Sequence, residues 1–175
     1  RERSQDKRQN AYPYYDIYEA ENLIAHGDFS RARGLLESAL PRFRDFDRLA
    51  RARTIALLIK SRENEKYFWQ GFSSAEQRSL LELKEELFRL LPSELRYAGY
   101  SLPVIFRQDA EIDAGTASDV RRRLFRVRFS EAPEELKTQV HFAVEIRGSS
   151  TGGAVISLVD LSTGQSVAAA AEELP

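Results

Sequence analysis

The chain of 175 residues contains no cysteine, no methionine and only two histidines. Without cysteine, the sequence excludes disulfide bonds, thiolate zinc sites and cysteine nucleophiles. It also lacks the residue patterns of zinc-dependent proteases, phosphate-binding loops, dinucleotide-binding folds and serine hydrolases. We therefore expect a protein that is not an enzyme, with no catalytic residues, no bound metal and no cofactor.

Positive and negative charges are nearly balanced, because the chain has 26 Lys and Arg residues and 27 Asp and Glu residues, which gives a net charge of −1. A strong basic excess is the usual mark of a nucleic-acid binder, so this balance argues against nucleic acid as a partner. No apolar run approaches the ~18 residues that a membrane-spanning helix needs. Because position 1 is Arg1 rather than methionine, we expect a processed chain that touches a membrane only through a removed N-terminal anchor.

Residues 1–10, RERSQDKRQN, have no large apolar side chain and predict a solvated tether. Residues 11–95 instead show helical periodicity and form the first predicted domain. Gly27 is expected to end the first helix and Asp28 to cap the second. The four predicted helices cover residues 14–26, 28–41, 45–62 and 73–91. Their predicted inner faces are Ile17, Ala20, Leu23 and Ile24; Ala32, Leu35, Leu36 and Ala39; Leu49, Ala52, Ile55, Ala56 and Ile59; and Leu80, Leu83, Leu87 and Leu90.

Residues 101–175 change character and form the second predicted domain, a small antiparallel β-sheet or β-sandwich. Alternating and β-branched segments predict strands at residues 102–112, 140–147, 154–161 and 165–171, separated by glycine-containing turns. Residues 119–130 are compatible with a helix or a strand. We favour the strand, in which Phe125, Val127 and Phe129 face inward. The expected fold class is thus α+β, with a helical first half and a β second half.

Residues 13–46 resemble one tetratricopeptide repeat, a helical hairpin with a period of 34 residues. The matching positions are Ala20, Gly27, Asp28-Phe29, Ala32, Leu36 and Ala39-Leu40. Asp16 departs from the pattern, since the family usually has tryptophan there, and Pro41 comes earlier than the usual terminal proline. The following residues repeat the motif poorly, so a generic four-helix bundle is the alternative to a repeat-like domain.

This resemblance implies a protein or peptide partner, because such repeats usually bind one on a concave surface formed by their first helices. The corresponding surface here is expected to present Tyr14, Ile17, Glu21 and Ile24, with Tyr18 nearby. A second expected contact is Trp69, which belongs to an aromatic group with Tyr67, Phe68 and Phe72. That group either packs in the core, which we favour, or anchors the partner.

A second, shorter resemblance concerns residues 158–167, which contain Val159-Asp160 followed by Thr163-Gly164. This pattern is similar to a hairpin common in bacterial cell-envelope lipoproteins and small β-sandwiches. Together with the tether and the removed leader, it implies a periplasmic or outer-membrane-anchored protein, with a cytoplasmic location as the alternative. The leading expectation is a non-catalytic adaptor or assembly factor of a bacterial envelope machine.

Two alternative functions rest on clusters of charge. Asp109, Glu111 and Asp113 would share one face of a strand and could serve a metal-dependent hydrolase, although such a row is more often a solvated face. Arginines at positions 121–123, 126 and 128 could bind nucleic acid, although such a cluster is more often a charged surface. Of the two histidines, His26 is expected to interact with a helix end and His141 to lie on the surface.

Overall fold

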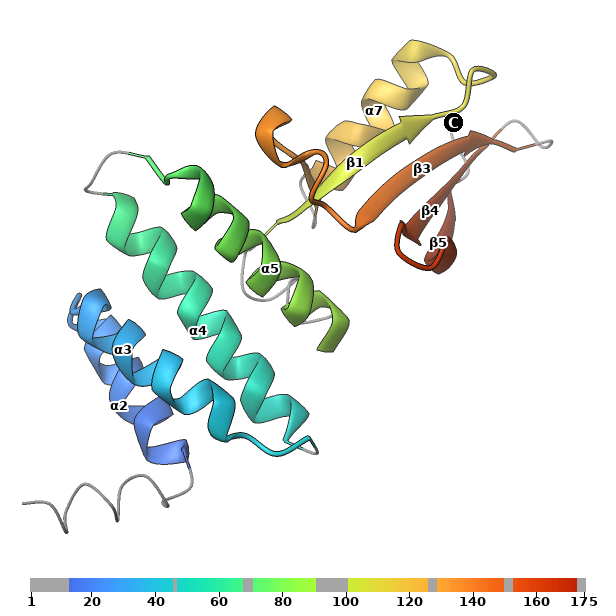
Figure 1. The fold of residues 1–175 in the computed structure, drawn as a ribbon. Coiled ribbons are helices and arrows are strands. Elements are labelled where there is room, and N and C mark those ends of the chain that lie inside the picture. Colours follow the sequence, from blue (N-terminus) through green and yellow to red (C-terminus); the bar gives the residue numbers. More distant parts are fainter. Residues whose placement is uncertain are drawn as a thin grey trace, which may run out of the picture. The chain divides into compact units, whose positions relative to one another are not determined.

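The computed structural model describes residues 13–45, 47–67, 71–90, 101–125, 129–149 and 153–172 (Figure 1). The chain divides into two compact units. The helical unit comprises residues 1–73 and 86–94, and the sheet unit comprises residues 74–85 and 95–175. Helices therefore dominate the first half and strands the second, which confirms the α+β class.

The helical unit contains α2 (Tyr14–Ala25), α3 (Phe29–Ala39), the short 3-10 helix η1 (Leu40–Arg42), α4 (Arg48–Tyr67) and the end of α5 (Ser74–Leu90). Gly27 ends α2 with a positive φ of 80°, and its N–H donates to the carbonyl of Ile24. The side chain of Asp28 accepts the N–H of Arg31 and so caps α3. The hinge between the first two helices is thus built as the sequence predicts.

Small residues let the helices of this unit approach closely. Ala20, Ala32 and Ala39 are completely buried, on the faces that the periodicity predicts. Leu49 was expected on the inner face of α4, but it is 72% exposed. Ala50 takes the inward position of that first turn instead, in contact with the cluster around Ile17. Since neighbouring residues on a helix lie about 100° apart, Leu49 is turned toward solvent.

Arginine–carboxylate pairs join neighbouring helices of the same unit. The Arg42 guanidinium lies 2.6 Å from the Asp16 carboxylate, and Arg62 lies 2.9 Å from Glu37. Such partly exposed pairs each stabilise a fold by only about 0.2–1 kcal/mol. The first pair nevertheless accounts for Asp16, the residue that departs from the repeat pattern, because its carboxylate ties α2 to η1.

Two glycines of the hairpin predict opposite effects on stability. No atom lies near the place where a Cβ would be added at either Gly27 or Gly34. Gly27→Ala should lower the free energy of unfolding by about 1 kcal/mol, because alanine is strained at positive φ. Gly34→Ala should raise it by about 0.5–1 kcal/mol, because Gly34 lies within α3, where alanine is the better helix former. Urea denaturation of the two variants checks this; equal effects of the same sign would contradict the account of the hinge.

The sheet unit contains β1 (Leu102–Gln108), α7 (Ala114–Phe125), β2 (Phe129–Glu131), η2 (Glu134–Leu136), β3 (Phe142–Gly148), β4 (Ala154–Asp160) and β5 (Gln165–Glu172). The strand order is β2-β1-β3-β4-β5. Strands β3, β4 and β5 pair antiparallel as expected. In contrast, β1 is parallel to both β2 and β3, so the sheet is mixed rather than wholly antiparallel.

The preference for a strand over residues 119–130 is wrong for most of the segment. Residues up to Phe125 continue α7, and only Phe129 and Ser130 belong to β2. The physical reason is the parallel pairing of β1 with β2, which requires a crossover connection that a helix supplies. A helix start is also encoded locally, because the Asp113 side chain accepts the N–H groups of Gly115 and Thr116 at 3.1 and 2.9 Å.

Candidate functional site

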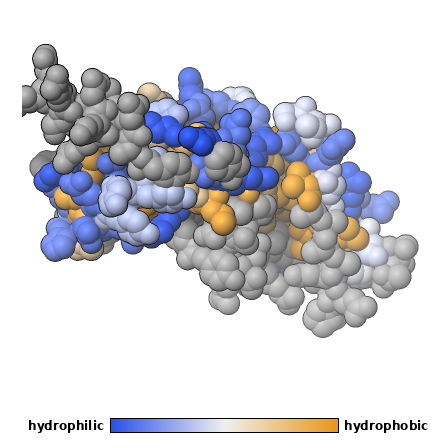
Figure 2. Space-filling view, turned by 90° about the horizontal axis from the view of Figure 1, so that it is seen from below, coloured by the Kyte–Doolittle hydropathy of each residue, from blue (hydrophilic) through white to orange (hydrophobic). Residues whose placement is uncertain are grey.

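Exposed large apolar side chains gather at one place in the helical unit. Among the described residues, the exposed large hydrophobics are Tyr14, Tyr15, Tyr18, Leu49 and Val167. The first three lie on α2 and Leu49 lies in the first turn of α4. On the face drawn in Figure 2, the coloured atoms show hydrophobic residues as separate patches among hydrophilic ones. This concentration marks the edge shared by α2 and α4 as the candidate site.

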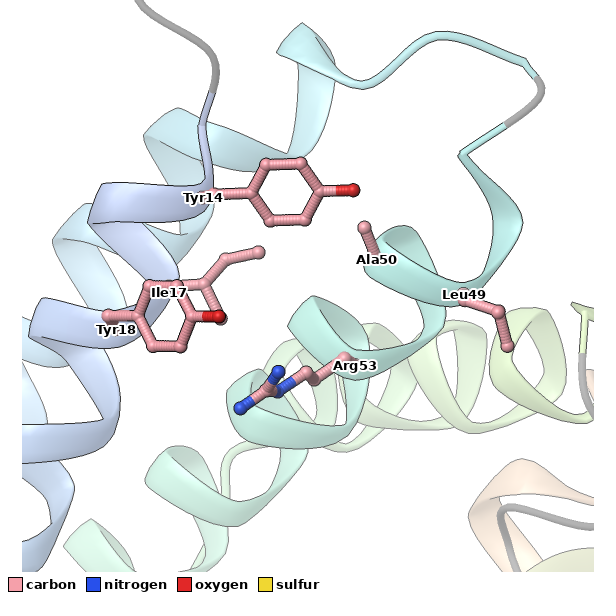
Figure 3. Close-up of a pocket in the computed structure, with 6 residues that line it drawn as sticks. All are labelled: Tyr14, Ile17, Tyr18, Leu49, Ala50 and Arg53. Carbon is pink, nitrogen blue, oxygen red and sulfur yellow. The ribbon is translucent and has the colours of Figure 1, made fainter.

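A groove runs along that edge, with a cavity volume of about 170 Å³. Its walls come from two helices, α2 and α4. The lining residues are Tyr14, Ile17, Tyr18, Leu49, Ala50 and Arg53. In Figure 3 the side chains of Tyr14, Ile17 and Arg53 point into the space between the two helices, whereas Leu49 points away from α2. We call this feature the α2–α4 groove; its floor is apolar and its rim carries aromatic and polar groups.

Arg53 fixes one side of the groove. Its Nε donates to the Glu21 carboxylate at 2.8 Å, and its guanidinium carbon lies 5.6 Å from the centre of the Tyr18 ring. That distance is within the range of a cation–π interaction. Glu21 therefore compensates the charge of Arg53, and the arginine in turn supports the tyrosine ring. The groove is preorganised by contacts between α2 and α4.

The residues that the sequence predicts to bind the partner differ in their exposure to solvent. Tyr14 and Tyr18 are 43% and 55% exposed and line the groove, while Glu21 contributes through Arg53. Ile17 and Ile24 are buried, on the inner face that their helical spacing predicts; Ile17 still lines the floor of the groove, whereas Ile24 does not line it. The remaining candidate, Trp69, lies outside the described residues.

Two groove residues were missed from the sequence. The helical spacing places Leu49 in the core, and no sequence pattern singles out Arg53. The two residues are four positions apart and so occupy the same side of α4. That spacing is the local signal that could have identified them. It indicates a groove, however, only when α4 is known to lie beside α2. The ion pair between Arg53 and Glu21 spans 32 positions of sequence, which no local pattern reveals.

A buried carboxylate forms a second polar feature, in the sheet unit. Glu85 is 6% exposed, and its two oxygens accept the backbone N–H of His141 at 2.8 Å and the imidazole Nδ1–H at 2.7 Å. A carboxylate can only accept here, so Nδ1 carries the hydrogen. His141 is exposed, as expected of a surface histidine, but its anchoring by Glu85 was not predicted.

The Glu85–His141 pair borders an open hollow with a volume of about 420 Å³. The other residues lining it are Arg78, Leu81, Glu82 and Gln139. The Arg78 Nε donates to the Gln139 side-chain oxygen at 2.8 Å. Since both oxygens of Glu85 are occupied, we assign this carboxylate a structural role: it holds the residue that precedes β3 against α5.

The acidic row does not share a strand face, because β1 ends at Gln108 and the three carboxylates follow it. That expectation is wrong. Asp113 instead caps α7, and hydrogen bonds from Thr116 and Gly115 lower the pKa of its carboxyl group. This contribution to stability is present above the ordinary aspartate pKa and is lost as the pH falls through the lowered value. No three His, Asp or Glu side chains among the described residues gather to hold a metal ion.

The arginine cluster and the remaining histidine serve local contacts where the structure describes them. On α7, Arg122 lies 3.5 Å from Asp119, one turn earlier. The cluster's residues 126–128 lie outside the described part of the chain. His26 Nδ1 is 2.7 Å from the carbonyl oxygen of Asn22, which matches the expected interaction with the end of α2.

Among the helices that the structure describes, none combines the length and the hydropathy required to cross a bilayer. No protein-family model, curated protein or solved structure matches this chain.

Proposed function

We propose that this chain is a non-catalytic binding module that holds a segment of another protein in the α2–α4 groove. The observation that carries the proposal is the gathering of Tyr14, Tyr18 and Leu49, all exposed, around one groove. Tyrosine is enriched at the energetic centres of protein interfaces, because its ring contributes a large contact area and its hydroxyl remains hydrogen-bonded.

The character of the groove favours a protein segment with an aromatic or aliphatic anchor. Its volume of about 170 Å³ is close to that of a cavity known to accept benzene, about 150 Å³. Among the described residues that line the groove, Arg53 is the one with a charge, and it is paired with Glu21, so these residues present no uncompensated charge to an ionic ligand. An apolar floor inside a polar rim is the usual anatomy of a protein interface.

The role of an adaptor or assembly factor in a bacterial cell envelope extends this proposal. It rests on sequence features alone, namely the hairpin pattern at residues 159–164 and the polar segment of residues 1–10. The tetratricopeptide-like hairpin of residues 13–46 is consistent with it, since α2 supplies the groove-facing tyrosines and corresponds to the first helix of such a repeat.

Loss of groove side chains should weaken partner binding without unfolding the protein. We expect the double variant Tyr18→Ala/Leu49→Ala to recover its partner about tenfold less well than the unaltered chain, since truncating interface anchors costs upward of about 1–2 kcal/mol. The measurement is affinity purification of the full-length protein from its native cells, with quantitative mass spectrometry of the proteins recovered.

Tyr15→Ala is the matched control, because Tyr15 is 82% exposed on the same helix but does not line the groove. It should leave partner recovery unchanged, and circular dichroism should show all variants folded. A partner retained equally by the double variant would move the binding site elsewhere. Recovery of the chain without any stoichiometric protein partner would contradict the proposed function itself.

A further inference from the structure

The two histidines of the chain are held in the same tautomer by different groups. The Nδ1 of His26 lies 2.7 Å from the carbonyl oxygen of Asn22, and the Nδ1 of His141 lies 2.7 Å from a carboxylate oxygen of Glu85. A carbonyl and a carboxylate can only accept, so Nδ1 carries the hydrogen in both rings, and Nε2 of each neutral ring keeps its lone pair. The two sites differ in the charge beside the ring, because a carbonyl is neutral and a carboxylate is negative.

The buried carboxylate beside His141 favours reactions in which the ring becomes positive. The Glu85 side chain is 7% exposed, whereas the His141 side chain is 55% exposed. When Nε2 forms a bond to an electrophile, the ring keeps its hydrogen on Nδ1 and acquires a positive charge. Because Glu85 is shielded from water, its attraction for that charge is screened less than the attraction of a surface carboxylate. Histidine activated by an adjacent group is one of the side chains that form covalent intermediates.

The open hollow beside His141 also contains a cation. Arg78 and His141 both line the hollow, and both belong to the sheet unit. Leu81 packs with Val140, which holds α5 against the segment that carries His141. The Arg78 Nε donates to the Gln139 side-chain oxygen, and within the described part of the chain no carboxylate pairs with this guanidinium. Its terminal amino groups are therefore available to bind an oxyanion, and paired N–H groups of arginine suit phosphate.

We propose that His141 accepts a phosphoryl group on Nε2 and that Arg78 binds the phosphoryl oxygens. The donor is a phosphoramidate, a compound or side chain in which phosphorus is bound to nitrogen. The Nε2 lone pair attacks phosphorus, the phosphorus–nitrogen bond of the donor breaks, and the electron pair of that bond leaves with the donor's nitrogen. The Nδ1 hydrogen stays on the ring, where Glu85 stabilises the positive charge. This modification goes beyond the proposed binding function and is independent of the α2–α4 groove.

The test uses the reagent phosphoramidate itself on the full chain at neutral pH, with ammonia as the leaving group. Tandem mass spectrometry under non-acidic conditions locates the phosphoryl group and gives the initial rate at each histidine. We expect the reaction at His141 to be about tenfold faster than at His26, the factor that about 1.4 kcal/mol of transition-state stabilisation provides. A rate at His26 equal to or above the rate at His141 would overturn the proposal.

Variants test the groups around His141, with His26 in the same molecule as the reference. Glu85→Gln should lower the rate at His141 to the rate at His26, because an amide supplies no negative charge. Arg78→Gln should also lower it, and Arg78→Lys should retain part of it, because lysine keeps the positive charge. Glu82→Gln, which alters an exposed residue at the same hollow, is the matched control and should not lower the rate.

Circular dichroism decides which variant is informative. An unchanged rate at His141 in folded Glu85→Gln would overturn the role of the carboxylate and with it the proposal. If Glu85→Gln does not fold, the exposed Arg78 provides the decision: an unchanged rate at His141 in Arg78→Gln overturns the proposal, and a lowered rate that Arg78→Lys partly restores supports it.

Discussion

Ile17→Ala should lower the free energy of unfolding by about 2–5 kcal/mol, the usual cost of truncating a fully buried aliphatic side chain. Ile17 is 2% exposed and packs with Ala39, Phe43 and Ala50, and its neighbours come from three segments that follow α2. Such a loss is large beside the total stability of a typical domain, about 5–15 kcal/mol. Urea denaturation followed by circular dichroism measures it.

Tyr15→Ala is the comparison within the same helix, and it should change stability by no more than about 0.5 kcal/mol, because its side chain is largely in solvent. The contrast matters for the function, since Ile17 also forms the floor of the α2–α4 groove. Because Ile17→Ala is expected to destabilise the fold, a loss of partner binding by this variant alone would not identify Ile17 as a binding residue. If Ile17→Ala leaves the free energy of unfolding unchanged, the packing of α2 against the rest of the helical unit is incorrect.

Glu85→Ala should lower the free energy of unfolding by about 2–3 kcal/mol. The substitution removes a charged acceptor from the backbone N–H of His141 and from its ring. Hydrogen bonds to charged groups contribute about 1.5–3 kcal/mol, and the substitution leaves the His141 N–H without the acceptor that it has in the structure. Thermal or urea denaturation provides the measurement.

Two further variants separate this explanation from a general effect of charge. Glu85→Gln keeps one oxygen that can accept a hydrogen bond, so its loss should be smaller than that of Glu85→Ala. Glu82→Ala removes an exposed carboxylate one turn earlier on α5 and should change stability by less than about 0.5 kcal/mol. Equal losses for positions 82 and 85 would show that the buried contact with His141 contributes nothing.

The helical hairpin could be predicted from sequence because its signals are local. Apolar spacing gave the inner faces of α2 and α3, and Gly27 with Asp28 marked the bend between them. These residues act through contacts within a few positions, and tertiary packing reinforces the same choice. The prediction was less accurate for α4, where a shift of one residue decides whether Leu49 or Ala50 faces the core.

The errors in the second half arise from contacts between distant segments. The alternation of Phe125, Val127 and Phe129 is typical of a strand. However, β1 and β2 are parallel, and the connection between them contains a helix, α7, that includes Phe125. The residues in and around a strand do not by themselves determine which other strand it pairs with. The same holds for the site: Glu85 meets His141 across 56 positions and Arg53 meets Glu21 across 32. Only folding brings these side chains together.

The most direct test of the binding function is site-specific photo-crosslinking in the native cells of the full-length protein. The photoreactive amino acid p-benzoylphenylalanine would replace Tyr18 or Leu49 in the groove, and Ser38 on the exposed surface of α3 as a control. We predict that positions 18 and 49 crosslink to the same protein and that position 38 does not. Crosslinking to that protein from position 38 alone, or to no protein from positions 18 and 49, would contradict binding in the α2–α4 groove.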